Sequence, residues 1–297
     1  MAGYLCLVAM SRTPSRVLVT GAAGRLGGAV LRVLAAHGAA VVGLDRHDPG
    51  TDTFFTGSAS DVDLVAKAMA GVDAVIHLAA IPAPDQGTPE EVFVGNASAT
   101  FVVLDQAARA GVTRAVIASS LSITGLPFAP HPAAPDYVPI DEAMPLQAAD
   151  PYALSKQADE ATAAMVARRD GMAVVALRFP KLGTAEFLAE YAREYRAEPG
   201  AGAHEVWSYL DMRDAAIACR LGLTAQITGA HPLYLAAPET LSPYPTEALL
   251  ARYLPDVPLR KPLSGRAVPI DTSAATALLG FTPEHLIDIE PAELGEM

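Results

Sequence analysis

A glycine-rich turn near the N-terminus constrains the fold of this chain more than any other feature. Gly21, Gly24 and Gly27 stand three residues apart, directly after the apolar run 16–20 and at the start of a helical pattern over 25–37. In such a unit the first glycine permits a tight turn, the second lets the backbone approach a pyrophosphate, and the third lets helix and strand pack closely. The free N–H groups at the helix start attract an anion. The turn therefore predicts a phosphate-binding α/β unit; a purely structural glycine turn is the alternative.

Strand and helix patterns alternate through the first half of the chain. Short runs that are apolar throughout are separated by longer segments with helical patterns. The predicted strands are 16–20, 40–45, 73–78, 113–119 and 172–178, and the predicted helices are 25–37, 61–70, 89–110 and 151–169. Strands that are apolar on both faces indicate a parallel sheet with helices on both sides. Right-handed crossovers then give an α/β fold with a doubly wound, Rossmann-type sheet.

An acidic residue closes the second predicted strand. Asp45 lies about 20 residues after Gly24, which is the spacing expected of a carboxylate that binds the ribose hydroxyls of a dinucleotide. A carboxylate at this position repels a 2′-phosphate, so Asp45 favours NAD over NADP. Arg46 and Arg25 could instead pair with such a phosphate, and NADP therefore stays open.

Two regions depart from the alternation. Seven prolines fall within 127–151, which excludes a helix or a central strand and predicts a long loop, either functional or decorative. Beyond 180 the pattern is less regular, and helices are expected at 184–196, 211–222, 244–253 and 272–279. We expect a tail over 1–14 (or a chain start at Met10), a Rossmann domain over 15–180 and a smaller substrate-binding lobe over 181–297, interleaved with the Rossmann domain.

Composition narrows the classes of function. The 297 residues carry a net charge of −12 with a pI near 5.0, so nucleic acid and anionic membrane surfaces are poor partners. No apolar run reaches the roughly 18 residues of a membrane span, and the apolar stretch 2–10 lacks the basic residues of a secretory signal. Cys6 and Cys219 are too few for a disulfide scaffold, and no Cys/His cluster indicates a metal. We expect a cytoplasmic protein that binds small molecules and no metal.

A tyrosine and a lysine four residues apart stand at the start of the predicted helix 151–169. Tyr152 and Lys156 would share one helix face. A nearby ammonium lowers the pKa of a tyrosine from its usual value of about 10, so that the phenolate can take a proton from a substrate hydroxyl. Ser120 ends the fourth predicted strand, where open parallel sheets bind ligands and a hydroxyl can orient the reacting oxygen. A tyrosine and lysine at this spacing also arise by chance, so the pair gains weight only beside the glycine turn and Asp45.

These motifs make the chain resemble the extended short-chain dehydrogenase/reductase family, in its branch of NAD-dependent sugar epimerases and dehydratases. The resemblance covers about 16–290 and rests on TGAAGRLG, Asp45, IHLAA at 76–80, Asn96, SSLSITG at 119–125 and PYALSK at 151–156. It implies that Tyr152 is the catalytic base, Lys156 its partner and Ser120 the catalytic serine. The cofactor-binding residues expected on this basis, with Arg46 added beside Asp45, are Gly21, Gly24, Arg25, Leu26, Gly27, Asp45, Arg46, Ser58, Ala59, Leu78, Ala79, Ala80, Asn96, Ser119, Tyr152, Lys156 and Pro180.

Departures from the family pattern bear on the reaction. Ser58 stands where the family usually has an acid beside the adenine, and the run Ser120-Leu121-Ser122 lacks the acid that dehydratases and decarboxylating relatives carry. Substrate contacts are expected from Ser120, Ser122, Lys181, Tyr209 and Arg213. Lys181 would either bind a carboxylate or phosphate or stay solvated. For Tyr209 and Arg213, core packing and a helix cap are the alternatives.

Three functions follow from the resemblance. The first is an epimerase-like enzyme that oxidises a carbon of a sugar or nucleotide sugar and returns the hydride to its other face. The second is a simple dehydrogenase of a free sugar, uronate or related alcohol, which the small lobe and Lys181 slightly favour. The third, a non-catalytic NAD-sensing module, fits less well because Tyr152 and Lys156 are both present. Relatives often form homodimers through helices that match 89–110 and 151–169, so a homodimer is expected.

Overall fold

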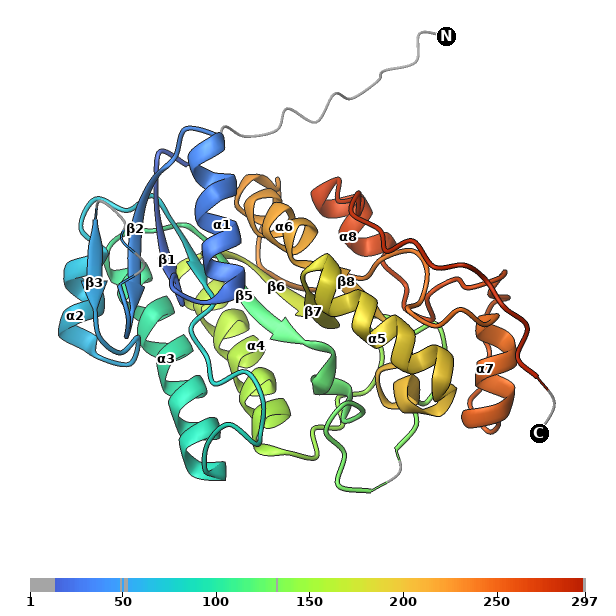
Figure 1. Cartoon of the computed structure of the whole chain (residues 1–297). Helices are drawn as coiled ribbons and strands as arrows, with labels where there is room; N and C mark the ends of the chain where they lie inside the picture. The colour runs from blue at the N-terminus through green and yellow to red at the C-terminus, as the bar shows by residue number, and fades with distance from the viewer. Residues whose placement is uncertain (1–13, 49, 51–52, 132, 296–297) are drawn as a thin grey trace, which may run out of the picture.

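A seven-stranded parallel sheet forms the centre of the molecule (Figure 1). The computed structural model describes residues 14–48, 50, 53–131 and 133–295. The strand order is β3-β2-β1-β4-β5-β6-β9, and every neighbouring pair is parallel. The strands are β1 (Arg16–Thr20), β2 (Ala40–Asp45), β3 (Phe54–Thr56), β4 (Ala74–His77), β5 (Arg114–Ser120), β6 (Ala173–Phe179) and β9 (Ala230–Tyr234). The predicted α/β fold with a doubly wound Rossmann sheet is confirmed.

Helices cover both faces of this sheet. One face carries α1 (Arg25–Ala36), α6 (Met212–Thr224) and α8 (Ser273–Leu279), and the other carries α2 (Val62–Ala68), α3 (Pro89–Arg109) and α4 (Pro151–Asp170). Figure 1 shows α1 beside α6 on one side and α3 beside α4 on the other. The chain runs outward from β1 to β3 and then crosses back to β4. The carboxyl ends of β1 and β4 therefore diverge, which is where open α/β sheets bind ligands.

Local chemistry explains why the predicted boundaries lie close to the observed ones. Thr88 and Glu91 form a capping box at the start of α3, and Asp150 accepts a hydrogen bond from the Ala153 amide at the start of α4. Gly171 ends α4 in the left-handed conformation that glycine adopts without strain. The pattern did not predict β9, because Pro232 interrupts it. The strand tolerates that proline because β9 pairs only with β6, at the edge of the sheet.

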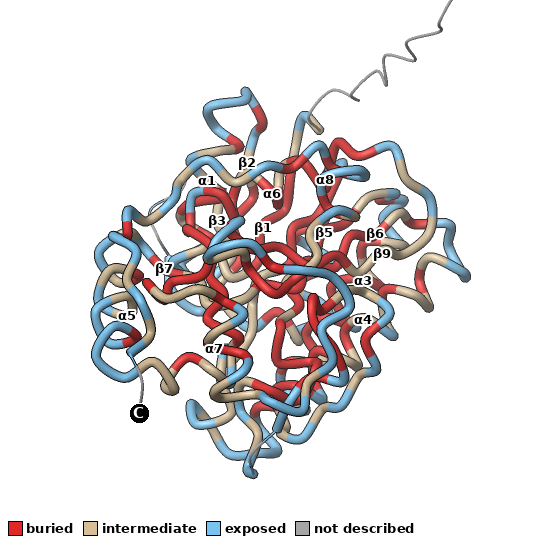
Figure 2. The backbone as a smooth tube through the Cα atoms, turned by 90° about the vertical axis from the view of Figure 1, so that its right-hand side faces the viewer, coloured by how far each residue is buried: buried red, intermediate tan, exposed pale blue. Residues whose placement is uncertain are grey.

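A smaller group of elements packs beside the carboxyl ends of the sheet. It contains β7 (Lys181–Gly183), α5 (Ala185–Ala197), the 3₁₀ helix η2 (Pro199–Glu205), β8 (Tyr209–Asp211) and α7 (Thr246–Tyr253). These elements share a separate apolar core that includes the fully buried Trp207. Figure 2 shows buried backbone both in the sheet and beneath α7. The division of the chain at residue 180 into a Rossmann domain and a smaller lobe remains a proposal. The two parts would interleave, because β9 and α6 follow residue 180 but belong to the sheet layers.

The proline-rich segment contains neither helix nor strand among its described residues up to Asp150, as predicted, and its last proline, Pro151, begins α4. It joins the smaller group of elements through isolated parallel bridges, from Val138 to Leu259 and from Ile140 to Ile270. Both of its bridging residues are fully or almost fully buried. The segment is therefore packed into the fold between β5 and α4.

The remaining expectations concern membrane spans, metal sites, the N-terminal tail and the cysteines. Within the described part of the chain, no helix is long and apolar enough to cross a membrane. The same residues contain no group of three or more His, Cys, Asp or Glu side chains placed to hold a metal. The expected tail, with Cys6 and Met10, falls almost wholly on residues 1–13, which lie outside the described residues. Cys219 is buried in α6.

Candidate active site

Two adjoining cavities lie at the carboxyl ends of the strands. The first has a volume of about 490 Å³ and extends from Asp45 and Ser58 to Asn96. The second has a volume of about 370 Å³ and contains Tyr152 and Lys156. The residues that line both are Gly21, Gly24, Leu78 and Ala80. The cavities therefore meet over the glycine turn, where β1 and β4 diverge. This is the shape that a two-part ligand such as a dinucleotide requires.

The glycine turn leaves no room for side chains. A Cβ at Gly21, whose φ is +70°, would lie 2.7 Å from the Ala79 amide nitrogen. A Cβ at Gly27 would lie 2.1 Å from the Gly21 carbonyl oxygen. Gly24 is the N-cap of α1 and offers no side-chain acceptor, and the first turn of α1 contains no acidic residue. The first turn of α1 thus presents its N–H groups to the second cavity, next to the place where the two cavities meet, and this arrangement fits a pyrophosphate.

Asp45 supports this turn from the end of β2. Its Oδ2 accepts a hydrogen bond from the Ala23 amide at 3.0 Å, and its Oδ1 accepts one from the Arg46 amide at 2.6 Å. Asp45, Arg46, Ser58 and Ala59, all expected at the cofactor, line the first cavity. A carboxylate placed there can also accept hydrogen bonds from ribose hydroxyls.

The end of β4 is fixed by buried polar contacts. The Thr20 hydroxyl accepts hydrogen bonds from the Leu78 and Ala79 amides, each at 3.3 Å. Thr20 Oγ1 also lies 2.7 Å from Nδ1 of His77, and burial, assisted by the nearby Lys156 charge, lowers the pKa of His77 to about 3. A neutral imidazole therefore sits beneath the point where the cavities meet.

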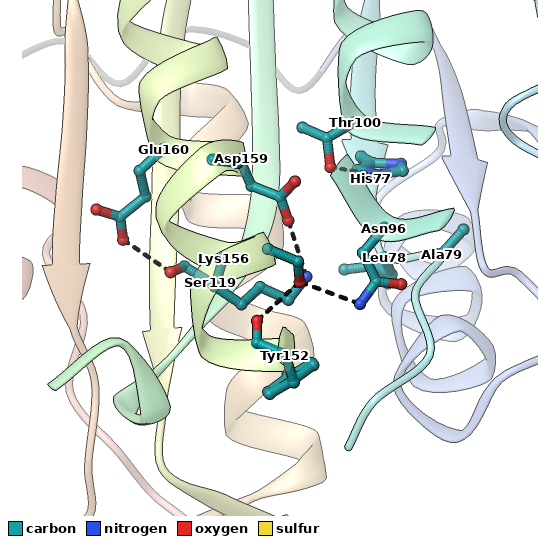
Figure 3. Close-up of polar contacts among 12 residues, drawn as sticks. His77, Leu78, Ala79, Asn96, Thr100, Ser119, Tyr152, Lys156, Asp159 and Glu160 are labelled. Atoms are coloured by element: carbon teal, nitrogen blue, oxygen red, sulfur yellow. Dashed lines mark hydrogen bonds and ion pairs between the residues drawn. The ribbon is translucent and has the colours of Figure 1, made fainter. Parts of the chain in front are cut away.

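Asn96, on α3, links this loop to the helix that carries Tyr152. Its Oδ1 accepts a hydrogen bond from the Ile81 amide at 2.7 Å, and its Nδ2 donates to the Ile81 carbonyl at 3.0 Å. Nδ2 also donates to Ser155 Oγ at 3.2 Å, and Ser155 Oγ donates to the Tyr152 carbonyl at 2.7 Å (Figure 3). Asn96 lines the first cavity and holds its wall in place.

The first turns of α4 place Tyr152 and Lys156 in the second cavity. The Lys156 ammonium lies 5.6 Å from the centre of the Tyr152 ring and forms a 3.0 Å ion pair with Asp159 Oδ2. The Lys156 and Asp159 side chains are only 4% and 1% exposed. Burial by itself opposes charge on Lys156, but the Asp159 carboxylate, together with Tyr152 and Glu160, outweighs this effect and raises the pKa of the lysine. Lys156 is therefore a fixed positive charge beside the phenol.

The serines at the end of β5 are placed differently from one another. Ser120 lines the second cavity, and its Oγ accepts a hydrogen bond from the Ser122 amide at 3.1 Å. Ser119 also lines it, while its Oγ donates to Glu160, which forms two 2.8 Å hydrogen bonds with Arg178. Ser122, expected at the substrate, is fully buried and lines neither cavity, because the 3₁₀ turn after β5 directs it inward.

Two further substrate residues expected from the sequence do not reach the cavities. Tyr209 is buried in the core of the smaller group of elements, where its hydroxyl accepts a hydrogen bond from the Ile287 amide at 3.1 Å. Arg213 points to solvent and forms an ion pair with Asp211, the N-cap of α6. Core packing and a cap interaction account for these positions. Pro180 and Lys181 do line the second cavity.

Several cavity residues were missed by sequence reasoning. Phe128, from the proline-rich segment, packs edge-on against Tyr152 with ring centres 5.8 Å apart. Glu205 lines the same cavity from the end of η2 and pairs with Lys181. Neither belongs to a motif, so no sequence signal pointed to them. Asp159 could have been found, because an acid three residues after Lys156 lies on the same helix face.

The fold and site define a nucleotide-dependent oxidoreductase of the Rossmann type: a glycine turn, a carboxylate at the end of β2, and a Tyr–Lys pair in the adjoining cavity. The model of the NAD dependent epimerase/dehydratase family matches residues 17–195. The chain belongs to this family, as the motifs predicted.

Known proteins of several activities are similar to this chain. It is 30% identical over 202 residues to the L-arabinose 1-dehydrogenase (NAD(P)(+)) of Haloferax volcanii, a match that covers 63% of this chain and 78% of that enzyme. It is 34% identical over 232 residues to the 2-alkyl-3-oxoalkanoate reductase of Stenotrophomonas maltophilia, covering 72% and 67%. The match to the UDP-glucose 4-epimerase of Streptomyces lividans, at 31% identity, covers 48% of this chain and only 45% of the epimerase.

Solved structures support the same fold. A short-chain dehydrogenase/reductase superfamily protein from Agrobacterium tumefaciens with bound NAD superposes with a TM-score of 0.69 at 26% identity. That alignment covers 91% of this chain and 93% of the Agrobacterium protein.

Proposed function

We propose that this protein is an NAD-dependent dehydrogenase that moves a hydride between a hydroxyl-bearing carbon of a small, sugar-like molecule and the nicotinamide. One observation carries this proposal: Tyr152, Lys156 and Ser120 line a cavity that adjoins the glycine turn, with Gly21 and Gly24 shared between the two cavities. The site thus combines a place for a dinucleotide with a base at its far end. The small number of cysteines and the acidic net charge of the chain fit the expected cytoplasmic location, and that location remains a prediction.

The chemistry of the site follows from the charges around the phenol. Tyr152 takes the proton from the substrate hydroxyl in the oxidative direction, and the fixed charge of Lys156 stabilises the phenolate that this requires. Ser120 donates a hydrogen bond to the reacting oxygen and holds it near Tyr152. A bound NAD would supply the acceptor for the hydride from the same carbon. Phe128 covers the Tyr152 ring and reduces access of water to the reacting atoms.

The cofactor would be held by residues of both cavities. The amides of Arg25 and Leu26 would bind the pyrophosphate, and Asp45 the adenosine ribose. The Gly24 amide already donates to the Gly21 carbonyl at 3.0 Å, so Gly24 would contribute the close approach of its backbone. Asp45 supports NAD over NADP, because a 2′-phosphate would meet its carboxylate. Arg46 also lines this cavity, so limited use of NADP is the alternative.

Net dehydrogenation is favoured over epimerisation by the size of the second cavity. Its volume of about 370 Å³ must hold the nicotinamide as well as the substrate. That volume is close to the lower end of the range, about 300–1,000 Å³, that surrounds a single drug-sized ligand. A small substrate fits this space better than a nucleotide sugar does. Epimerisation remains the second candidate, supported by the match to the UDP-glucose 4-epimerases.

We also propose a homodimer formed through α3 and α4. The exposed apolar side chains Val94 and Phe101 on α3, and Leu154 on α4, are 59%, 47% and 46% exposed. The two helices pack against each other, so their apolar residues can contribute to one surface. Light scattering of the purified protein would test this state.

Identification of the bound nucleotide, together with a turnover screen, tests the proposed reaction. The purified protein is denatured and the released nucleotides are identified by mass spectrometry. Fresh protein is then given NAD and a panel of aldoses and alcohols, and the near-ultraviolet absorbance of reduced nicotinamide is followed. A dehydrogenase gives steady reduction of added NAD. Stoichiometric NAD in the released fraction, with isomerised sugar and no net reduction, would identify an epimerase instead.

A further inference from the structure

An ion pair forms part of the wall of the cavity that contains Tyr152. Lys181 Nζ lies 3.0 Å from Glu205 Oε2, and the two side chains are 13% and 14% exposed. Both residues line this cavity. Lys181 begins β7, and Glu205 ends η2, so the pair connects two elements of the smaller, C-terminal part of the fold.

Neighbouring side chains hold this pair in place. The Lys181 ammonium lies 3.7 Å from the centre of the Tyr191 ring, a distance at which a cation is attracted to the ring face. The Tyr195 hydroxyl donates a hydrogen bond to Glu205 Oε2 at 3.4 Å, and His204 Nε2 lies 3.7 Å from Glu205 Oε1. A pair with these supports has a defined geometry, unlike a mobile surface ion pair.

Both ammonium groups that line this cavity are paired with carboxylates. Among the described residues that line it, the cationic ones are Arg25, Lys156 and Lys181. Lys156 is paired with Asp159, and Lys181 is paired with Glu205. Arg25 is the first residue of α1, beside the expected pyrophosphate position. Neither ammonium that lines this cavity is therefore without a carboxylate partner in the described structure.

The pairing of Lys181 with Glu205 determines which substrates can approach Lys181. A carboxylate or phosphate would have to displace Glu205 from Lys181 and then lie close to that carboxylate, at a cost that burial increases. A neutral polyhydroxy compound can instead donate a hydroxyl hydrogen bond to Glu205 and accept one from Lys181 while the pair stays intact. Hydrogen bonds to charged groups of this kind are stronger than those between neutral groups.

We propose that Glu205 and Lys181 act as a specificity-determining pair that selects uncharged polyhydroxy substrates, such as free aldoses, over their carboxylate and nucleoside diphosphate forms. This inference rests on the proposed function, because it assumes that the substrate enters the cavity containing Tyr152. The proposal assigns a role to Glu205, which no sequence motif indicated. For Lys181, it replaces direct binding of an anion by pairing with Glu205.

Matched sugars that differ by one charge test the proposal. The probes are glucose with glucuronate, galactose with galacturonate, and UDP-glucose. Each is assayed with NAD for kcat/KM, and its binding to the NADH-loaded protein is measured separately by ligand-observed NMR. The variants are Glu205→Gln and, as a control with the same charge change on exposed α5 surface, Glu190→Gln.

We expect the unmodified protein to prefer the neutral member of a pair by about tenfold or more, which corresponds to one charge-assisted hydrogen bond. Glu205→Gln should free Lys181 and reduce this preference about tenfold, while Glu190→Gln leaves it unchanged. A preference for the uronates or UDP-glucose, equal behaviour of the two variants, or absence of binding by every probe would overturn the proposal. Selective binding of the neutral sugars without any NAD reduction would support the pair's role but refute the proposed hydride transfer.

Discussion

Replacement of His77 by glutamine tests the electrostatic environment beneath the proposed active site. His77 is 3% exposed; its Nδ1 lies 2.7 Å from Thr20 Oγ1 and its Nε2 lies 3.1 Å from Thr100 Oγ1. Burial, with a further contribution from the Lys156 charge, lowers the pKa of His77 to about 3. The imidazole is therefore neutral in the folded protein at neutral and mildly acidic pH.

The sign of the resulting pH dependence follows from proton binding in the two states. In the unfolded chain a histidine binds a proton below about pH 6.5, whereas folded His77 binds none until about pH 3. Acidification therefore favours the unfolded state, and the stability that His77 contributes is lost as the pH falls from about 6.5 towards 3. Between pH 7 and pH 5 this loss is about 2 kcal/mol.

Urea unfolding at several pH values measures this effect. Glutamine does not titrate, so His77→Gln should lose about 2 kcal/mol less stability than the unmodified protein between pH 7 and pH 5, whatever its stability at neutral pH. His37→Gln, on the exposed end of α1, is the matched control and should keep the original slope. Equal slopes for His77→Gln and the unmodified protein would refute the neutral, buried imidazole.

Three further substitutions test other parts of the site. Gly27→Ala should abolish NAD binding measured by calorimetry, since its Cβ would lie 2.1 Å from the Gly21 carbonyl oxygen; unchanged affinity would contradict the account of the turn. Asp45→Ser should increase the ratio of NADP to NAD activity about tenfold or more, and an unchanged ratio would remove Asp45 from the ribose site. Asp159→Asn should destabilise the protein by about 3 kcal/mol in urea unfolding, because Lys156 would keep a buried, unpaired charge; a loss below about 1 kcal/mol would show that the lysine finds another partner.

The sheet and most of its helices could be predicted from local pattern alone. Strands such as β1 and β2 have continuous apolar centres, and helices such as α4 carry a cap at each end, so neighbouring residues determine their limits. β9 escaped prediction because its edge position, which tolerates Pro232, is a property of the assembled sheet.

Within the candidate site, too, local pattern could place some residues, while the positions of others depend on the assembled fold. Tyr152 and Lys156 could be placed together because they are one helical turn apart on a helix beside the carboxyl end of β5. Glu205 could not, because its approach to Lys181 depends on how β7 and η2 are both placed against the intervening helix α5, which is a tertiary arrangement. The role of Tyr209 stayed open at the level of sequence for a similar reason: an aromatic residue near a family motif fits a substrate pocket and a core equally well until its neighbours are known, and the structure buries it in the core.

The most direct test of the account is Tyr152→Phe, assayed for NAD binding and for hydride transfer with a substrate that the unmodified protein accepts. The variant keeps the ring that packs against Phe128 but lacks the oxygen that takes the proton. We predict unchanged NAD affinity and a loss of kcat of at least about a hundredfold, the lower end of the contribution of a general base. Turnover close to that of the unmodified protein would contradict the assignment of Tyr152 as the base.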